Sequence, residues 1–327
     1  MMLSMAPAVM TSILHIASHP EIPGVECVTA TPDAATPSAW PRPYVGVIGS
    51  MHGNEPCGRL AIDRLEDEIK EGLRLVQGTL FLIHGNVEAS EQGHRHTEEG
   101  TDLNRLFNFD FIDRLPEHHW TSEHRRAVAL RDLLDSLDVA LDLHSATAPT
   151  PPFGIVSTVP ASALLARKLG LPYLTHGWEG PGQLGDRVML QMLSQRHKPS
   201  IAVECGQHDD PRSIERAYKT TKHFLVAIDM LPPEDAPALQ PEPALELNIV
   251  DAIKKPSPGF IFQGGFVGLQ QIKAGTVVGS DDNLEVRCKR NCYVIMPNAS
   301  VEVGSDMLYL AHQFDPATVD PSTLPVI

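Results

Sequence analysis

The chain has 327 residues and carries 26 Lys and Arg residues against 41 Asp and Glu residues, so its formal net charge is −15. This acid excess disfavours nonspecific binding to nucleic acid or to an anionic membrane, because both partners repel the protein. A hydrophobic content of 42% allows a sizeable core and excludes a disordered tail. The sequence also lacks the run of about 18 uncharged apolar residues that a membrane helix needs. We therefore expect a globular enzyme with one large or two modest domains, and no nucleic-acid or membrane partner.

The cysteines and the first residues bear on cellular location. The chain has five cysteines, an odd number that is widely scattered. This pattern argues against a disulfide framework and for a reducing compartment, so we expect a cytoplasmic protein. Residues 1–17 are apolar but contain no Lys or Arg. A ragged N-terminus or a later start is favoured over a signal peptide.

Segments typical of strands and helices alternate through the first two thirds of the chain. Short apolar runs predict strands, and apolar positions at helical spacing predict helices. The expected strands cover 44–49, 79–83, 139–143 and 200–203, and the expected helices cover 56–70, 122–137 and 211–230. This rhythm predicts an α/β fold, with a mainly parallel or mixed sheet and helices on both faces.

The composition then changes. Residues 231–243 contain five prolines and no periodic pattern, which is typical of a linker. Beyond them, short β-rich runs are separated by Gly, Asp and Asn, as in a small all-β domain. We predict a catalytic domain over 1–230, with 1–20 possibly ragged, a Pro-rich linker over 231–243 and a β domain over 244–327.

A first candidate site follows the first predicted strand. His52 and Glu55 lie three residues apart in a glycine-bearing turn between a strand and a helix. Ligands of open α/β sheets bind at the carboxyl ends of strands, where this turn falls. Imidazole and carboxylate could therefore converge on one cation. The alternative is a Glu favoured by the dipole at a helix N-terminus, beside an incidental His.

A second candidate site ends a later strand. Asp142 and His144 point the same way on a strand, because residues i and i+2 share a face. A metal-bound His usually donates its other ring nitrogen to a carboxylate, which is the role expected of Asp142. A lone His at a strand end is more often a loop residue, but the earlier His-x-x-Glu favours a metal. Two imidazoles and one carboxylate leave a fourth position open, as in a catalytic zinc site.

Two further motifs could complete an active site. Asn104 and Arg105 could bind a carboxylate through a directed amide and a planar guanidinium, although this motif taken alone favours a surface salt bridge of Arg105 with Glu98 or Glu99. Glu204 follows a buried strand run over 200–203. Near a metal-activated water it could act as general base, and otherwise it could be part of a buried ion pair.

Four motifs in this order resemble one family. The motifs are His52-Gly-Asn-Glu55, Asp102-Leu-Asn104-Arg105, Asp142-Leu-His144 and Val203-Glu204-Cys-Gly206. Together they resemble the succinylglutamate desuccinylase/aspartoacylase family of zinc deacylases, which have a carboxypeptidase-like catalytic domain. The resemblance covers about residues 45–210, and the predicted C-terminal β domain agrees with the family architecture.

The resemblance implies a role for each motif. It implies that His52, Glu55 and His144 bind one Zn²⁺ ion per subunit. Glu204 would be the catalytic acid/base, and Asn104 with Arg105 would bind the α-carboxylate of a small-molecule N-acyl amino acid.

The sequence departs from the family pattern at the substrate arginines. Members commonly carry another Arg eight residues before Arg105, where this chain has Thr97. Arg95, two residues earlier, could take that role if the loop carries a two-residue shift. The loop over 145–153 also lacks a basic residue, which disfavours a dicarboxylic acyl group such as succinyl. The glycine-rich stretch 177–182, with Arg187 beyond it, is interpreted as a plain connection rather than as a rim that contacts substrate.

We therefore expect a cytoplasmic zinc-dependent amidohydrolase that removes an acyl group from an N-acyl amino acid. One alternative is a metallocarboxypeptidase that acts on short or modified peptides with the same metal site. Another is a non-catalytic binding protein on the same fold. The acyl group, the amino acid and a homo-oligomeric state stay open.

Overall fold

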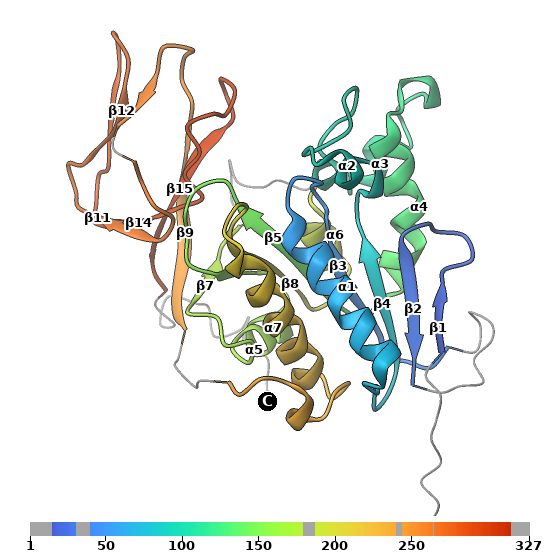
Figure 1. Cartoon of the computed structure of the whole chain (residues 1–327). Coiled ribbons are helices and arrows are strands. Elements are labelled where there is room, and N and C mark those ends of the chain that lie inside the picture. Colours follow the sequence, from blue (N-terminus) through green and yellow to red (C-terminus); the bar gives the residue numbers. More distant parts are fainter. Residues whose placement is uncertain (1–14, 31–39, 179–186, 240–243, 264, 315–327) are drawn as a thin grey trace, which may run out of the picture.

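One mixed sheet runs through the molecule. The computed structural model describes residues 15–30, 40–178, 187–239, 244–263 and 265–314. The large sheet has the strand order β1-β2-β4-β3-β5-β8-β6-β7-β9-β15-β14-β11, and a three-stranded sheet has the order β10-β12-β13 (Figure 1). The strands are β1 (His15–Ser18), β2 (Val25–Thr29), β3 (Tyr44–Gly49), β4 (Thr79–His84), β5 (Val139–Ala146), β6 (Phe153–Val156), β7 (Tyr173–His176), β8 (Ser200–Gln207), β9 (Leu245–Lys254), β10 (Ile261–Phe262), β11 (Gln270–Ile272), β12 (Val277–Ser280), β13 (Glu285–Arg287), β14 (Cys292–Ile295) and β15 (Asp306–Gln313).

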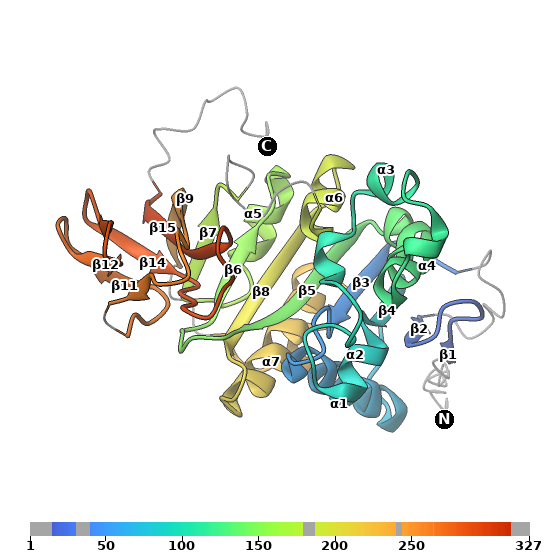
Figure 2. The same ribbon diagram turned by 90° about the horizontal axis from the view of Figure 1, so that it is seen from above.

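Helices cover both faces of the sheet, which confirms the predicted fold class. They are α1 (Pro56–Glu71), α2 (Val87–Gln92), α3 (Phe109–Ile112), α4 (Ser122–Ser136), α5 (Pro160–Ala166), α6 (Met189–Gln195) and α7 (Arg212–Ala227), with short 3-10 turns η2 (Leu103–Arg105), η3 (Glu117–His119) and η4 (Pro233–Asp235). Figure 2 shows α1 and α7 on one side of the sheet and α4 and α6 on the other. In the described part of the chain, no helix is both long and apolar enough to cross a membrane.

The two strands at the centre are longer than predicted. β5 continues to Ala146 and β8 continues to Gln207, so His144 and Glu204 lie inside their strands and not at the ends. The expectation that both residues end a strand is therefore wrong. The physical reason is that their side chains face a cavity while their backbones stay in the ladder, where His144 pairs with Glu204 in parallel register.

Side chains on these strands alternate between two environments. On β5, Leu141 and Leu143 belong to the apolar core under α1 and α7. Asp142 and His144 point to the opposite face, because successive strand residues alternate. The same alternation on β8 places Glu204 on the face of His144, beside it in register. The period of the strand therefore gathers three polar groups on one side of the sheet.

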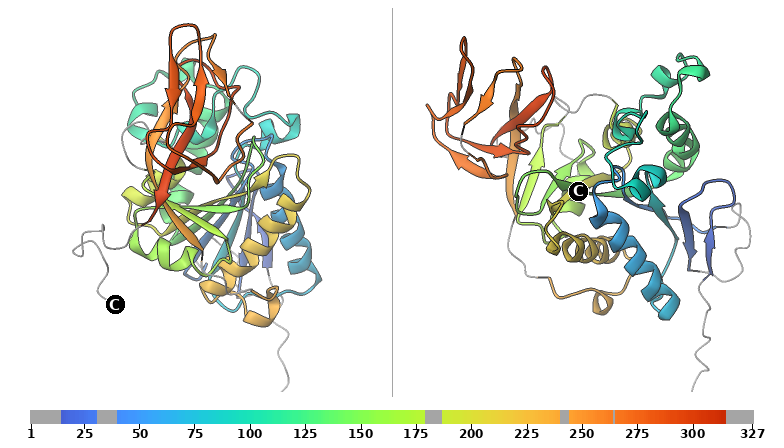
Figure 3. Two further views of the ribbon diagram at one scale, coloured as in Figure 1. Left: turned by 90° about the vertical axis from the view of Figure 1, so that its left-hand side faces the viewer. Right: turned by 45° about the horizontal axis from the view of Figure 1, so that its top comes forward.

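The C-terminal part is all β, as expected. Its strands β9, β15, β14 and β11 extend the large sheet, because β9 pairs in parallel with β7 and antiparallel with β15. Figure 3 shows these strands, coloured orange to red, projecting from one end of the molecule. The predicted domain limits stay a prediction. The predicted linker falls partly on 240–243, and the predicted ragged start falls largely on 1–14, both outside the described residues.

Helix α1 approaches β3 very closely at two glycines. A Cβ atom added to Gly49 would lie 2.5 Å from the carbonyl carbon of Gly58, and one added to Gly58 would lie 2.8 Å from the Cα of Gly49. The two backbones are therefore in contact, with no room for a side chain at either position. The loop between them carries His52 and Glu55, so this contact determines where that pair lies.

We predict that Gly49→Ala destabilises the protein by about 1–3 kcal/mol, because the added methyl group overpacks the β3–α1 contact. Urea unfolding of the variant and the wild type measures the difference. Gly259→Ala is the matched control, since a Cβ there would meet nothing within 4 Å. Equal stability of Gly49→Ala and wild type would contradict this account of the contact.

Candidate active site

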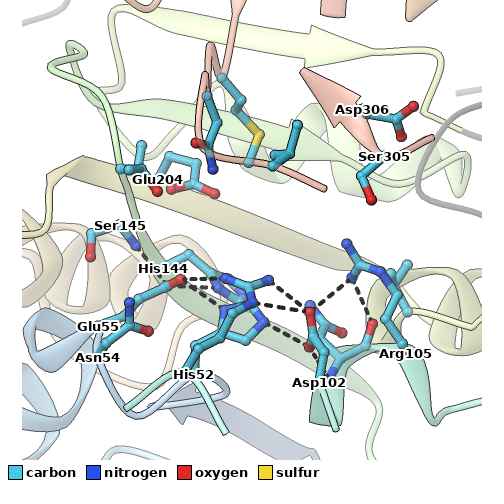
Figure 4. Close-up of a pocket in the computed structure, with 18 of the residues that line it drawn as sticks. His52, Asn54, Glu55, Asp102, Arg105, His144, Ser145, Glu204, Ser305 and Asp306 are labelled. Atoms are coloured by element: carbon cyan, nitrogen blue, oxygen red, sulfur yellow. Dashed lines mark hydrogen bonds and ion pairs between the residues drawn. The ribbon is translucent and has the colours of Figure 1, made fainter. Parts of the chain in front are cut away.

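A cavity of about 930 Å³ lies on the polar face of β5 and β8. Figure 4 shows its labelled residues, with His52, Glu55 and His144 close together and Arg105 and Asp102 further along the same wall. Residues 296–298 and 300–302, together with 304–306 and Tyr309, contribute another wall from the C-terminal strands and loops. The cavity is thus built from both parts of the chain.

The structure brings the three predicted metal ligands together. Nδ1 of His52 lies 2.8 Å from Oε1 of Glu55, and Nδ1 of His144 lies 3.0 Å from Oε2 of the same carboxylate. One potential ligand atom from each residue lies within 4.8 Å of the others. All three side chains are buried. Three donor atoms that converge in this way are able to share one cation.

The other nitrogen of each imidazole faces a carboxylate. Nε2 of His144 lies 2.8 Å from Asp142, as the sequence predicts, and Nε2 of His52 lies 2.9 Å from Asp102. These contacts hold the proton on Nε2 and leave the Nδ1 lone pair for a metal. Sequence reasoning missed the role of Asp102, although it begins the Asp-Leu-Asn-Arg motif, because it lies 50 residues from His52.

The charge of the site also favours a cation. Burial opposes the charged form of His144, but Asp142 and Glu55 outweigh it and raise the pKa of His144 well above its usual value. Burial likewise opposes the charged form of His52, whose pKa is nevertheless raised by Glu55 and Asp102. The imidazoles therefore lie in a strongly negative field. Two imidazoles and a carboxylate are a donor set that suits zinc, so the residues present fit this metal.

Glu204 has a free oxygen at the cavity. Its side chain is only 4% exposed, and its Oε2 has no hydrogen-bond partner among the described residues. Burial and the nearby Glu55 carboxylate raise the pKa of Glu204 to about 7. A carboxyl group with such a pKa can accept and release a proton near neutral pH. A divalent cation bound beside it would oppose this shift.

Asn104 and Arg105 line the same cavity and present donors to it. Oδ1 of Asn104 accepts a hydrogen bond of 2.9 Å from the backbone N–H of Met189, which leaves the amide NH₂ group as a donor. Arg105 donates from Nη1 to the carbonyl oxygen of Asn104 at 2.9 Å, and its side chain is 40% exposed. Its other N–H groups are thus available for a bound anion.

Arg95 has different partners from Arg105. Its Nε and Nη2 donate to Oδ2 of Asp102 at 3.2 and 2.7 Å, and its Nη1 lies 3.7 Å from Glu55. Arg95 is therefore held beside the metal ligands. Arg187 does not line the cavity, because its guanidinium stacks at 4.3 Å over the ring of Phe111. Of the glycine-rich stretch 177–182, residues 179–182 lie outside the described part of the chain.

Sequence reasoning also missed Glu123, which supports the loop carrying Arg95 and Asp102. The Glu123 side chain is completely buried. Its carboxylate accepts hydrogen bonds from the backbone N–H groups of Thr97 at 2.8 Å and Thr101 at 3.2 Å. Burial opposes ionisation, but hydrogen bonds led by that of Thr97 lower the pKa of Glu123 to about 2. No local pattern marks this role, because Glu123 stands at the start of helix α4.

The wall from the C-terminal part could not be placed from the sequence. Tyr309 lines the cavity, and its hydroxyl donates to Oδ2 of Asp306 at 3.0 Å. His208 lines the cavity next to β5, with Nδ1 2.8 Å from the hydroxyl of Ser145. These residues come from distant segments, so only the tertiary structure reveals that they share a cavity.

We predict that Asp102→Asn weakens the binding of a divalent metal by about 10–100-fold, because His52 loses the carboxylate that orients its ring. Competition with a chelator measures the affinity. Asp63→Asn is a control outside the cavity, since Asp63, in the middle of α1, pairs with Arg59 and with His84 of β4. An unchanged affinity in Asp102→Asn would show that this contact does not support metal binding.

We also predict a pH-dependent effect of Glu123→Gln. The pKa of Glu123 is lowered from 4.5 to about 2 on folding, so its carboxylate stabilises the protein above pH 4.5. That contribution is lost as the pH falls towards 2. The wild type should therefore be more stable than Glu123→Gln at pH 7, with a difference that shrinks between about pH 5 and pH 2. Thermal unfolding of both proteins across this pH range measures the difference in stability.

Glu99→Gln, at an exposed position, serves as the control. A stability difference between wild type and Glu123→Gln that does not vary with pH would contradict the prediction.

Comparison with known proteins places this arrangement in a family. A family model described as the succinylglutamate desuccinylase/aspartoacylase catalytic domain matches residues 41–227. Solved structures share the fold over nearly the whole chain. A succinylglutamate desuccinylase from Vibrio cholerae has a TM-score of 0.69 at 18% identity, covering 92% of this chain and 91% of its own. A succinylglutamate desuccinylase/aspartoacylase from Rhodobacter sphaeroides has a TM-score of 0.68 at 17% identity, covering 89% of each chain.

A third structure extends the comparison. The product-bound ectoine utilization protein EutE (DoeB) from Ruegeria pomeroyi has a TM-score of 0.66 at 18% identity, covering 92% of this chain and 94% of its own. At these identities the likeness shows a common fold, while the family match spans more than half of the chain. The chain therefore belongs to the succinylglutamate desuccinylase/aspartoacylase family.

Proposed function

We propose that this protein is a cytoplasmic, zinc-dependent amidohydrolase that removes the acyl group from an N-acyl amino acid. One observation carries the proposal. A His-Glu-His donor set, the buried carboxyl group of Glu204 and the exposed guanidinium of Arg105 line the same cavity. Hydrolysis of an N-acyl amino acid requires a metal or similar Lewis acid, a group that transfers the proton of water, and a cation that binds the substrate's carboxylate.

His52, Glu55 and His144 would hold one zinc ion per subunit and leave a fourth position open. When bound, zinc supplies Lewis acidity, which polarises the acyl carbonyl and lowers the pKa of a water molecule. Asp102 and Asp142 keep the two imidazole rings in the orientation and tautomer that present Nδ1 to the cavity.

The substrate's α-carboxylate would bind to Arg105 and Asn104. A guanidinium forms two parallel hydrogen bonds with a carboxylate, and the amide NH₂ of Asn104 adds a directed donor. Arg95, whose Nη1 lies 3.7 Å from Glu55, would stabilise negative charge on the oxygen of the scissile carbonyl. In this arrangement one end of the substrate is held by Arg105 while its amide lies at the metal ligands.

Glu204 would move the proton in the reaction. Its unpartnered Oε2 accepts the proton of the attacking water as the new C–O bond forms. The same carboxyl group then donates that proton to the departing nitrogen as the C–N bond breaks. The products are a carboxylate and a free amino acid. Burial and the Glu55 carboxylate raise the pKa of Glu204, and a bound divalent ion would oppose that rise, which favours the ionised form that accepts the first proton.

Two other functions use the same site. A metallocarboxypeptidase would need the same metal ligands and the same grip on a terminal carboxylate. The wall from the C-terminal part bounds the cavity on one side and disfavours a long peptide, so the assay below has to separate N-acyl amino acids from short peptides. A non-catalytic binding protein would have no use for a buried carboxyl oxygen without a partner, as Glu204 has.

The cytoplasmic location is supported by the cysteines. All five are free thiols in the structure and all five are buried. A reducing compartment keeps thiols in this state.

We predict that Glu204→Gln retains one zinc ion per subunit and loses amide hydrolysis by at least about 10²–10⁴-fold, because the proton carrier is removed while the ligands remain. Release of free amino acid from N-acyl amino acids and from dipeptides measures activity, and elemental analysis measures zinc. Glu285→Gln, an exposed position on β13, is the control.

The same assays separate the alternatives. Turnover of dipeptides without turnover of N-acyl amino acids would identify a carboxypeptidase. Wild-type protein that holds no zinc and hydrolyses neither class would support a binding protein. Full activity in Glu204→Gln would refute the role given to this residue.

A further inference from the structure

We propose that the acyl group removed by this enzyme is uncharged, so that an acyl group with its own carboxylate, such as succinyl, is a poor substrate. This inference rests on the proposed deacylase function and concerns the chemical class of substrate that the same cavity accepts. Its basis is the distribution of charged, polar and apolar groups over the cavity wall.

The cavity wall has few cations. Three Lys or Arg side chains line it in the described part of the chain, namely Arg95, Arg105 and Lys254, against six carboxylates. The segments outside the described residues contain no Lys or Arg in their sequence. They therefore have no cation to contribute. Even with a divalent ion bound, the carboxylates of the wall would outnumber its positive charges, so a second carboxylate on the substrate would still meet an excess of negative charge.

Two of the three cations are already paired. Nζ of Lys254 donates to Asp306 at 2.8 Å, and Arg95 donates to Asp102 at 2.7 Å. Arg105 lies 3.9 Å from Asp102, so its ion pair is the weakest of the three. In the proposed function Arg105 binds the α-carboxylate. No cation of the cavity is then left for a carboxylate on the acyl group.

The sheet beside the catalytic group is apolar. Ala202 shares a face of β8 with Glu204, and Ile155 on β6 pairs directly opposite Ala202. Both side chains line the cavity, together with Val188 and Leu190. These four residues belong to one apolar cluster. Placing a carboxylate against such a surface removes part of its hydration without offering a hydrogen-bond partner, which disfavours a charged acyl group.

The polar groups near the metal ligands accept hydrogen bonds more than they donate them. Oδ1 of Asn54, Oδ1 of Asp142 and Oε2 of Glu204 are buried oxygens without a partner among the described residues. Oxygens of this kind attract N–H, O–H or a metal ion and repel a carboxylate. The ring nitrogens of His208 already face the hydroxyls of Ser145 and Thr147. Apart from the metal and Arg95, both assigned to the scissile carbonyl in the proposed function, the metal end of the cavity therefore offers no ready site for an anion.

Three substrates that share one amino acid test the inference on the zinc-loaded enzyme. They carry an acetyl group, a succinyl group, or a succinyl group whose free carboxylate is a methyl ester. The ester has nearly the size of the succinyl group without its charge, so it separates charge from size. We expect kcat/KM for the acetyl and ester substrates to exceed that for the succinyl substrate by about tenfold or more.

The outcomes are distinct. A succinyl substrate that is hydrolysed as well as its ester, or better, overturns this inference and leaves the deacylase function standing. If none of the three substrates is hydrolysed, the proposed function itself is overturned.

A gain of charge in the cavity supplies the second test. Thr147 lines the cavity and is exposed, so a longer side chain is accommodated there. Thr147→Arg should raise kcat/KM for the succinyl substrate relative to its ester, because it adds an unpaired cation. Thr147→Gln, uncharged and of similar reach, should keep the wild-type ratio. If the ratio is the same in both variants, charge does not determine the selection and the inference is wrong.

Discussion

The alternation of side chains along β5 and β8 is the constraint on which the rest of the structure depends. Every second residue, such as Leu141 and Leu143, is buried against α1 and α7, and the burial of apolar surface there stabilises the sheet. The residues between them, Asp142, His144 and Glu204, are thereby placed in a polar cavity at a cost in solvation. The same ladder that forms the core holds the reactive groups, so a shift of one residue in register would exchange the two faces.

The concentration of carboxylates at the cavity links metal binding to stability. Glu55, Asp102 and Asp142 surround two imidazoles, and the six carboxylates of the cavity wall outnumber its three Lys and Arg side chains. A bound divalent ion would relieve this repulsion only in the folded protein, because the ligands come from separate segments. Binding to the folded state alone shifts the folding equilibrium by mass action.

Short sequence patterns are sufficient to predict two pairs of site residues and several helices and strands. His52 with Glu55 and Asp142 with His144 are pairs close in sequence, and turn or strand geometry alone brings the members of each pair together. The elements over 44–49, 79–83 and 122–137 were predicted nearly to the residue, because apolar periodicity is strong there. These are the parts of the fold and site that a short stretch of sequence determines.

The remaining features depend on tertiary contacts. Asp102 reaches His52 across 50 residues, and Glu123 reaches Thr97 across 26, so neither contact has a local signature. The wall near Tyr309 depends on the register of β15 against β9. The strands β5 and β8 are predicted too short, because His144 and Glu204 lie inside them and a carboxylate or imidazole is more typical of a loop.

The pairing of β7 with β9 has a consequence for how the molecule can be divided. Their parallel ladder, from Tyr173 with Leu245 to His176 with Asn248, joins the family's catalytic region to the C-terminal strands. A chain ended at residue 230 would leave β7 paired only with β6, as an edge strand whose free side is a template for aggregation. It would also open the cavity on the side of Tyr309. The C-terminal strands therefore cover the edge of the catalytic sheet.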